Sequence, residues 1–448
     1  MHPSITEECV IPFNTLYLPQ HLNRPLSVSC RAIHILIPNL KDRIPITWQT
    51  IPLPFLYHLP FFLLAYLARR PDTYLIRLFL LPLTIGGVVA AAYRFVWTPP
   101  EFNVYNWGQC LLAAVTIAKS LQYALTEEGM LKVGELRPGE MKGKGKEVTN
   151  GHADPIVHRG LSFVPPAVYD TIELIHTLRG LQWKFGQGAY VPKPNRPQER
   201  GPFLRATVIS FIQNFLLLDY LESMIKLFPG VGSPFGGSIF YPTLSPFLKY
   251  SVSTLIHVLT GSTILAGFGM VYDLITLIAV GCLDGSPASW PPVVDNPWGA
   301  DSMHNLWSKR WHQLLRQTFL VYGGYPGKWL AGDLGLLFGI FTASGLFHEC
   351  AMYSMGGGYD HAAPIFFAMQ GPILLLERLW NKLTGRRVRG WPGRLWVYSI
   401  IFLTAQPMTD AWHRRGLGGG MVIPPILSPT RMLFLPFARH FLSVCLQR

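Results

Sequence analysis

The chain has 448 residues and a net charge of +13, and 49% of its residues are hydrophobic while only 14% are charged. A soluble globular domain carries about 25% charged residues, so this composition excludes an ordinary soluble protein and indicates a large surface in a bilayer. The basic residues lie between the apolar runs, which fits cytoplasmic loops and gives no support to nucleic acid as a partner. Six scattered cysteines without a C-x-x-C pair indicate neither a disulfide framework nor a metal site.

Runs of about 20 apolar residues predict membrane spans. We expect an all-α, polytopic integral membrane protein with about nine transmembrane helices. The expected spans are residues 51–68, 73–93, 107–125, 204–226, 250–283, 329–349, 362–380, 395–412 and 430–446. The stretch 250–283 is too long for one simple span, so it tilts, breaks at a glycine, or forms two short helices.

Two regions complete the expected organisation. Residues 1–50 are an N-terminal segment, partly interfacial, and 51–448 form one multi-span domain. Within this domain, 126–160 is polar and glycine-rich and predicts a disordered cytoplasmic loop. The basic gap 381–394 is expected on the same side of the membrane.

The first candidate site is "HNLWSKRWHQLLRQTF", residues 304–319. In one continuous helix, Trp307 and Trp311 share a face, as do His312 and Arg316. A helix that combines tryptophan, leucine and arginine fits an interfacial or partly re-entrant position.

Two interpretations of this segment stay open. Arg310 and Arg316 would meet phosphates while the tryptophans stack a base, as a coenzyme A thioester requires. Alternatively, the segment anchors the protein at the membrane surface and binds no ligand.

The second candidate site follows a stripe of small residues. Gly335, Gly339 and Ala343 have small-xxx-small spacing, which predicts close packing against another helix. "FGIFTASGLFHEC", residues 338–350, then places an ionisable pair in an apolar run. Such a pair is costly to bury and therefore marks a candidate functional site.

His348 is the candidate acid–base residue of this segment, because imidazole titrates near neutral pH. Ser344 and Gly345, one turn earlier, are small enough to leave room for a substrate. Glu349 orients the histidine, lies at the membrane boundary, or pairs with a cation. A hydrogen-bonded structural histidine is the alternative.

Both segments resemble a known family. "NLWSKRWHQLLRQTF" resembles the W-x-x-R-W-H segment of the wax-synthase branch of the membrane-bound O-acyltransferases, and "FTASGLFHE" resembles the S-G-x-x-H-E segment of that family. "RGLQWKFG" (179–186) and "RPDTYLIRLFLLPL" (70–83) also look like pieces of its fungal members. H-x-x-x-D, G-x-S-x-G, H-E-x-x-H and Walker A motifs are absent from the sequence.

The resemblance implies acyl transfer from a coenzyme A thioester to an alcohol, in an intramembrane tunnel at the endoplasmic reticulum. His348 matches the catalytic histidine of the family. His312 stands where many relatives outside the branch have asparagine, so its role is open. Trp307, Arg310 and Trp311 match other fixed positions.

From this resemblance we expect a secondary-metabolite O-acetyltransferase. It would use acetyl-CoA as co-substrate, with no tightly bound cofactor and no metal. The catalytic residues would be His348 and His312, and Arg316 would join the three motif residues at the donor. Its partners would be the bilayer and an apolar hydroxylated molecule such as a terpenoid.

Other classes remain open. A long-chain wax-ester synthase would share both motifs, and a proton-coupled transporter could use His348 and Glu349 as a relay. A scaffold without catalysis is a third possibility. Neither the acceptor nor the oligomeric state is encoded in a recognisable motif.

Overall fold

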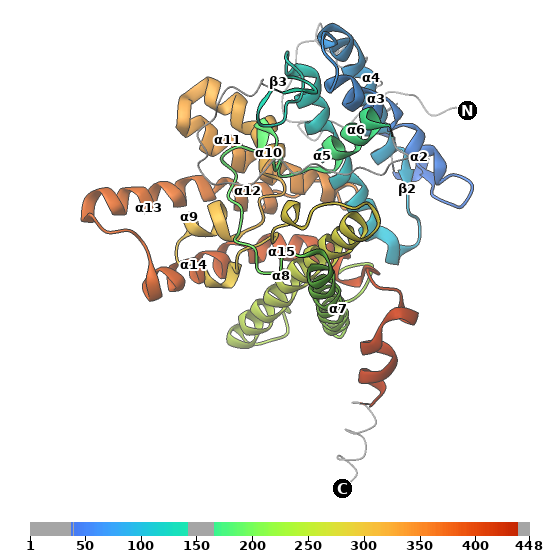
Figure 1. Cartoon of the computed structure of the whole chain (residues 1–448). Helices are drawn as coiled ribbons and strands as arrows, with labels where there is room; N and C mark the ends of the chain where they lie inside the picture. Colours follow the sequence, from blue (N-terminus) through green and yellow to red (C-terminus); the bar gives the residue numbers. More distant parts are fainter. Residues whose placement is uncertain (1–36, 39, 142–164, 438–448) are drawn as a thin grey trace, which may run out of the picture.

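The structure, a computed structural model, describes residues 37–38, 40–141 and 165–437. It is built almost entirely of helices (Figure 1). The α-helices are α2 (Pro52–Leu56), α3 (Leu59–Ala68), α4 (Tyr74–Tyr93), α5 (Asn103–Leu125), α6 (Pro166–His176), α7 (Arg200–Ile225), α8 (Pro246–Thr276), α9 (Met303–Asn305), α10 (Arg316–Phe319), α11 (Tyr325–Tyr353), α12 (Ala362–Ala368), α13 (Gln370–Thr384), α14 (Gly390–Thr404) and α15 (Gln406–Arg414).

Short 3-10 and π turns extend or connect these helices. They are η1 (Leu40–Asp42), η2 (Pro100–Phe102), η3 (Lys184–Gly186), η4 (Leu277–Cys282), η5 (Pro287–Ser289), η6 (Pro297–Gly299), η7 (Leu306–Arg310), η8 (Leu320–Gly324), η9 (Leu417–Gly419), η10 (Pro425–Leu427) and η11 (Thr430–Phe434). Two short strand pairs complete the fold. β1 (Ile44–Pro45) pairs in parallel with β2 (Phe95–Val96), and β3 (Glu135–Arg137) pairs antiparallel with β4 (Glu140–Met141).

Five segments of the described chain are long and apolar enough to cross a membrane: Tyr74–Tyr93, Arg200–Ile225, Pro246–Cys282, Arg316–Tyr353 and Ala362–Thr384. The protein is therefore a multi-pass membrane protein. Of the other expected spans, 107–125 lies in the continuous 23-residue helix α5, which is not among these five, and two more are interrupted. The first is divided into α2 and α3, and 395–412 is divided into α14 and α15. The last expected span, 430–446, is described only to residue 437. The full count of about nine and the tunnel stay predictions.

The apolar segment Arg316–Tyr353 is a helical hairpin and not one helix. Its backbone leaves the helical region at Ala331 and Gly332, and Gly332 has a φ of 60° that favours glycine. The segment reverses there into two antiparallel arms. The expected span 329–349 therefore corresponds to the turn and the second arm.

Glycines hold the two arms of the hairpin at backbone contact. A Cβ on Gly335 would lie 1.9 Å from the carbonyl oxygen of Gly327, and one on Gly323 would lie 2.0 Å from that of Gly339. Ala343 continues this contact beside Gly323. The close packing predicted for the small-residue stripe is confirmed.

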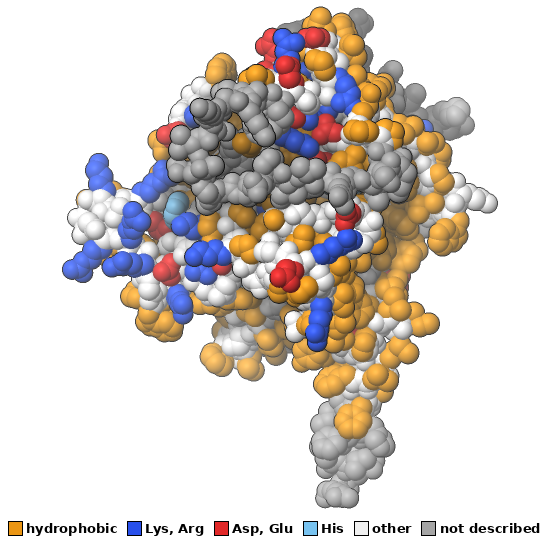
Figure 2. All heavy atoms as spheres, in the orientation of Figure 1, with side chains coloured by type: hydrophobic (Ala, Val, Ile, Leu, Met, Phe, Trp, Pro, Cys, Tyr) orange, Lys and Arg blue, Asp and Glu red, His pale blue; other side chains and the backbone are white. Residues whose placement is uncertain are grey.

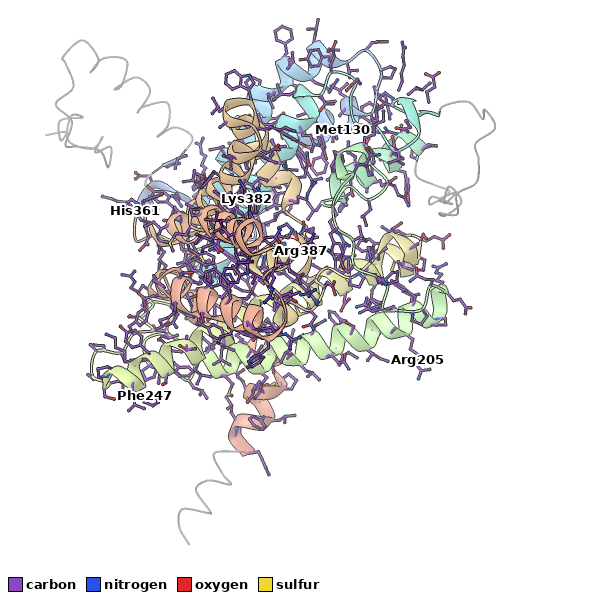
Figure 3. All side chains as sticks on the ribbon, turned by 90° about the vertical axis from the view of Figure 1, so that its left-hand side faces the viewer. Met130, Arg205, Phe247, His361, Lys382 and Arg387 are labelled. Atoms are coloured by element: carbon purple, nitrogen blue, oxygen red, sulfur yellow. The ribbon has the colours of Figure 1, made fainter. Side chains whose placement is uncertain are left out.

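Helices α7 and α8 form a long antiparallel pair. Figure 3 shows Arg205, near the start of α7, and Phe247, near the start of α8, at opposite ends of the pair. Asn214 of α7 packs directly on Gly269 of α8, where a Cβ would meet the Asn214 side chain at 2.7 Å. The long run 250–283 does not break at its glycines, because α8 continues into the π turn η4.

Part of the loop expected to be disordered is ordered. Residues 126–141 form turns and the β3–β4 hairpin, whereas 142–160 lie outside the described residues. The carboxylate of Glu135 accepts hydrogen bonds from Arg69 at 2.7 and 2.8 Å, and both side chains are buried. This buried ion pair fixes the hairpin on α3, so the expectation of disorder is corrected for 126–141.

The same arginine joins two segments that are distant in sequence. Arg69 also binds Asp170 of α6 at 2.5 Å and lies over the ring of Trp183 at 5.0 Å. Arg69 directly precedes the piece 70–83, and Trp183 belongs to the piece 179–186. The two weaker family-like pieces also meet in one apolar cluster, which contains Trp183 and is contacted by Leu80 and Leu81.

The outer surface fits a bilayer. Figure 2 shows hydrophobic side chains over much of the visible face and a group of basic side chains over the end of α13 and the turn to α14. Exposed Trp380 and Trp391 flank this turn. Its exposed cations are Lys382, Arg386, Arg387, Arg389 and Arg394. Tryptophan beside lysine and arginine is typical of a membrane–water interface.

Candidate active site

His348 lies on the second arm of the hairpin, in α11. Its ring is partly buried and stacks on Phe367 of α12, with centroids 4.6 Å apart and planes 19° apart. It also lies nearly parallel to Trp412 of α15 at 6.2 Å. Three helices therefore fix the orientation of this imidazole.

A hydrogen bond determines which ring nitrogen of His348 carries the proton. Nδ1 lies 2.7 Å from the carbonyl oxygen of Ser344. A carbonyl oxygen only accepts, so in the neutral ring Nδ1 carries the hydrogen and Nε2 keeps a free lone pair. Nε2 has no hydrogen-bond partner within 37–38, 40–141 and 165–437. This nitrogen is thus able to take a proton from a bound hydroxyl.

His312 lies in the irregular segment between η7 and α10. Its ring contacts Phe268 of α8 at 4.8 Å and Trp311 at 5.2 Å. Burial is the main cause that lowers the pKa of His312 to about 3, and the charge of His348 is a smaller cause of the same shift. His312 is therefore neutral near pH 7. A series of ring contacts through Trp311, Trp307 and Phe367 connects it to His348.

The nitrogen Nδ1 of His312 is enclosed but unpaired. It has no hydrogen-bond partner in the part of the chain that the structure describes. Unpaired buried polar atoms are few in native proteins. One that lies within the first motif, against Trp311, supports a functional role for His312.

The motif segment is not the continuous helix that we expected. The π turn η7 ends at Arg310, and the amide of the next residue, Trp311, donates to the carbonyl oxygen of Leu306 at 2.8 Å. The side chain of Gln313 then donates to the carbonyl oxygens of Trp307 and Trp311. These bonds satisfy the helix end and turn His312 toward α8, so His312 and Arg316 do not share a helix face.

Trp307 and Trp311 remain adjacent, with ring centroids 6.2 Å apart. Trp307 packs in the central apolar cluster, 6.1 Å from Phe367, and its indole nitrogen donates to Gln370 at 3.1 Å. Since Phe367 also stacks on His348, this ring connects the two motifs. Trp307 thus supports the site from within the core, and its contact with a donor stays a prediction.

The two motif arginines lie outside this aromatic cluster. Nη1 of Arg310 donates to the carbonyl oxygens of Asp295 and Asn296 at 3.1 and 3.4 Å. Arg316 lies beside Gly188 of the preceding loop. Phosphate binding by both arginines stays a prediction. Among the described residues, no group of three or more His, Cys, Asp or Glu side chains is placed to hold a metal.

Gly345 serves helix packing. A Cβ on Gly345 would lie 2.7 Å from Cα of Pro364 in α12. Ser344 is buried and accepts the His348 hydrogen bond through its carbonyl. The room that we expected at these residues is therefore occupied by α12, because the small side chain brings the two helices together.

Glu349 faces away from the imidazole pair. Its carboxylate binds the guanidinium of Arg415 at 2.8 and 3.2 Å and accepts the amide of Asp360 at 2.8 Å. The ion pair is buried. Of the three roles considered, the structure supports pairing with a cation, and Glu349 does not orient His348 through a hydrogen bond.

Sequence reasoning missed a carboxylate that positions the first motif. Glu377 of α13 accepts the backbone amides of Met303 and His304 at 2.7 and 2.9 Å, and the indole of Trp396 at 2.9 Å. A carboxylate at the start of a helix satisfies its free amides. The signal was present, because Glu377 interrupts an apolar run.

Phe367 and Trp412 were also missed. They are the two aromatic rings parallel to His348. Trp412 belongs to α15, where the polar sequence "QPMTDAWHRR" is largely buried. Buried polar residues next to a predicted span are the signal that could have identified this helix.

The fold and site define a helical, multi-pass membrane protein in which one aromatic cluster connects the histidines of the two motifs. Residues 290–369, which contain both motifs, match the Membrane bound O-acyl transferase family. The resemblance stated from the motifs is thereby confirmed.

Several curated fungal proteins are similar to this chain. "Acetyltransferase aurG" of Calcarisporium arbuscula is 27% identical over 145 residues, which cover 30% of this chain and 35% of that protein. "Acetyltransferase atnC" of Arthrinium sp is 32% identical over 140 residues, covering 27% and 32%. "Acetyltransferase ple2" of Rhodocybe pseudopiperita is 22% identical over 264 residues, covering 55% and 60%. Each match spans less than two thirds of the relative. No solved structure matches the chain.

Proposed function

We propose that this protein is a membrane-bound O-acetyltransferase that moves the acetyl group of acetyl-CoA to a hydroxyl of an apolar alcohol. The observation that carries the proposal is the hydrogen bond from Nδ1 of His348 to the carbonyl oxygen of Ser344, at 2.7 Å. This bond leaves Nε2 as a proton acceptor inside the segment that matches the acyltransferase family. The names of the similar fungal proteins support acetyl as the transferred group.

The reaction needs one base and no covalent intermediate. Nε2 of His348 takes the proton of the alcohol as its oxygen attacks the thioester carbonyl. The tetrahedral adduct collapses with cleavage of the carbon–sulfur bond, and the proton passes from His348 to the departing thiolate. The products are the acetate ester and free coenzyme A.

His312 has a different task from His348. With a pKa of about 3 it stays neutral at physiological pH, so it is suited to hydrogen bonding with the thioester or the adduct. Trp307 and Trp311 hold this segment in place, and Arg310 and Arg316 are the candidates for the phosphates of the donor.

The wider setting follows from the same proposal. The enzyme acts in the endoplasmic reticulum membrane, holds no tightly bound cofactor and takes a terpenoid or related secondary metabolite from the bilayer. A long-chain wax-ester synthase would use the same histidines with a different acceptor.

Purified protein in detergent, given labelled acetyl-CoA and a panel of alcohols, tests the proposal. Formation of a labelled ester by the wild type, and its loss in His348→Ala at equal protein amounts, is the expected result. A protein that consumes no acetyl-CoA with any alcohol, but moves protons across a vesicle membrane, would be a transporter.

A further inference from the structure

A cavity of about 470 Å³ lies between α7, α8 and the loop 287–298. In Figure 1, α7 and α8 lie side by side beneath α15. One face of α8 lines the cavity through Ser262, Phe268 and Tyr272, and α7 contributes Asn214. Its size falls within the range of about 300–1,000 Å³ that small-molecule sites occupy.

A single aromatic ring separates this cavity from the histidine pair. Phe268 lines the cavity, and the same ring contacts His312 at 4.8 Å. His312 in turn is connected to His348 by the packed rings of Trp311, Trp307 and Phe367. A molecule in the cavity therefore lies one side chain away from the site proposed for acyl transfer.

The charge of the lining indicates which of the two substrates, the acetyl donor or the acceptor alcohol, fits the cavity. Arg196 and Asp273 are the only charged residues among the described residues that line it, and they bind each other at 2.6 Å. The described part of the lining thus offers no unpaired cation to the phosphates of coenzyme A, which need several positive groups. A neutral ligand fits this lining better than an anionic one.

Resting on the proposed function, we propose that this cavity binds the acceptor, and that the acceptor is a compact, mostly apolar polycyclic alcohol with a second hydrogen-bonding group. The aromatic and proline-rich lining, including Trp290 and Trp298, supplies apolar contact area. A volume of about 470 Å³ suits a compact ring system better than an extended long chain.

Asn214 supplies the polar end of the cavity. Its Nδ2 donates to Asp273 at 3.0 Å and to Ser210 at 3.4 Å, which fixes the orientation of the amide. The structure gives Oδ1 no hydrogen-bond donor among residues 37–38, 40–141 and 165–437. This oxygen is therefore free to accept a hydrogen bond from a hydroxyl of the acceptor.

Ser262→Leu tests the location of the site, with Gly261→Leu as its control. The first places a larger apolar side chain in the cavity. The second adds the same side chain one position away, where a Cβ meets no atom within 4 Å. Equilibrium binding of labelled androstanediol, androstanol and hexadecanol to the full-length proteins in detergent is measured together with acetyl transfer.

We expect androstanediol to bind the wild type and G261L with equal affinity. Its affinity for S262L should be lower by a factor of about ten or more, because one added carbon group can change the affinity of an apolar pocket by this much. Hexadecanol should bind the wild type less tightly than androstanediol. Asn214→Leu should reduce the preference for the diol over androstanol. In S262L, the affinity for acetyl-CoA should be unchanged.

Each of the other outcomes would overturn a defined part of this proposal. Equal binding of androstanediol by S262L and G261L would remove the cavity as acceptor site, and weaker acetyl-CoA binding by S262L would make it the donor site. Tighter binding of hexadecanol would refute the compact class. Unchanged acceptor binding without ester formation in the wild type would instead refute the proposed acetyl transfer.

Discussion

Replacing His348 tests the chemistry most directly. His348→Ala removes the only atom that the proposal uses as a base, Nε2. A positioned general base contributes about 10²–10⁴ in rate, which at 1.36 kcal/mol for each factor of ten is about 3–5 kcal/mol of barrier. We therefore expect kcat to fall by at least a hundredfold.

Because His348 stacks on Phe367, His348→Ala removes packing as well as the base. A second variant that keeps the packing is therefore needed to interpret a loss of activity. His348→Phe keeps an aromatic ring 4.6 Å from Phe367 but has no proton acceptor. We expect H348F to accumulate and melt like the wild type and to be as inactive as H348A. His361→Ala, at an exposed histidine, is the matched control and should be fully active.

The assay follows labelled ester formation from acetyl-CoA, normalised to folded protein by size-exclusion chromatography in detergent. Turnover by H348F within a few-fold of the wild type would refute the role of Nε2. If H348A yields no folded protein while H348F folds and is active, the role of His348 is packing and not catalysis.

Three further predictions concern the surroundings of the site. Glu349→Gln leaves Arg415 buried without its charge partner and should lower stability by about 3–5 kcal/mol, measured as a lower Tm, while turnover per folded molecule changes little; an unchanged Tm would contradict this account of the pair. Gly335→Leu should prevent accumulation in membranes, because even a Cβ would meet the opposing backbone at 1.9 Å, whereas Gly86→Leu has open space and should accumulate normally. His312 binds a proton less readily in the folded state, since its pKa falls from 6.5 to about 3. Stability should therefore be lost as pH falls through this window, by up to about 1.4 kcal/mol per pH unit from this residue; His312→Asn should flatten the Tm–pH curve, and an unchanged curve would argue against a buried neutral ring.

The sequence pattern alone was sufficient to predict those features that depend on short-range spacing. The stripe Gly335, Gly339 and Ala343 predicted close helix packing, and the structure places it against the first arm of the hairpin. The apolar runs likewise predicted helical spans, since the length needed to cross a bilayer is fixed. The partner helix itself was not predictable, because nothing in the stripe identifies it.

Tertiary contacts decided the rest. A continuous helix over 304–319 agrees with local propensity, but the side chain of Gln313 ends it by binding two carbonyl oxygens. The partner of Glu349 is Arg415, 66 positions away, and no spacing rule identifies such a pair. The Glu377 contacts to the start of the first motif are similarly long in sequence. Donor contacts and the reaction tunnel stay predictions.

The glycine contacts of the hairpin also determine how far His312 lies from His348. The pairs Gly323–Gly339 and Gly327–Gly335 are both symmetrical about Ala331, so the same pairing carried outward brings the start of the first arm level with His348. An inserted residue within either arm would shift every later pair and displace one imidazole from the other, whereas an insertion at the turn would leave both arms in register. The number of residues between the two motifs therefore determines how the two imidazoles lie relative to each other.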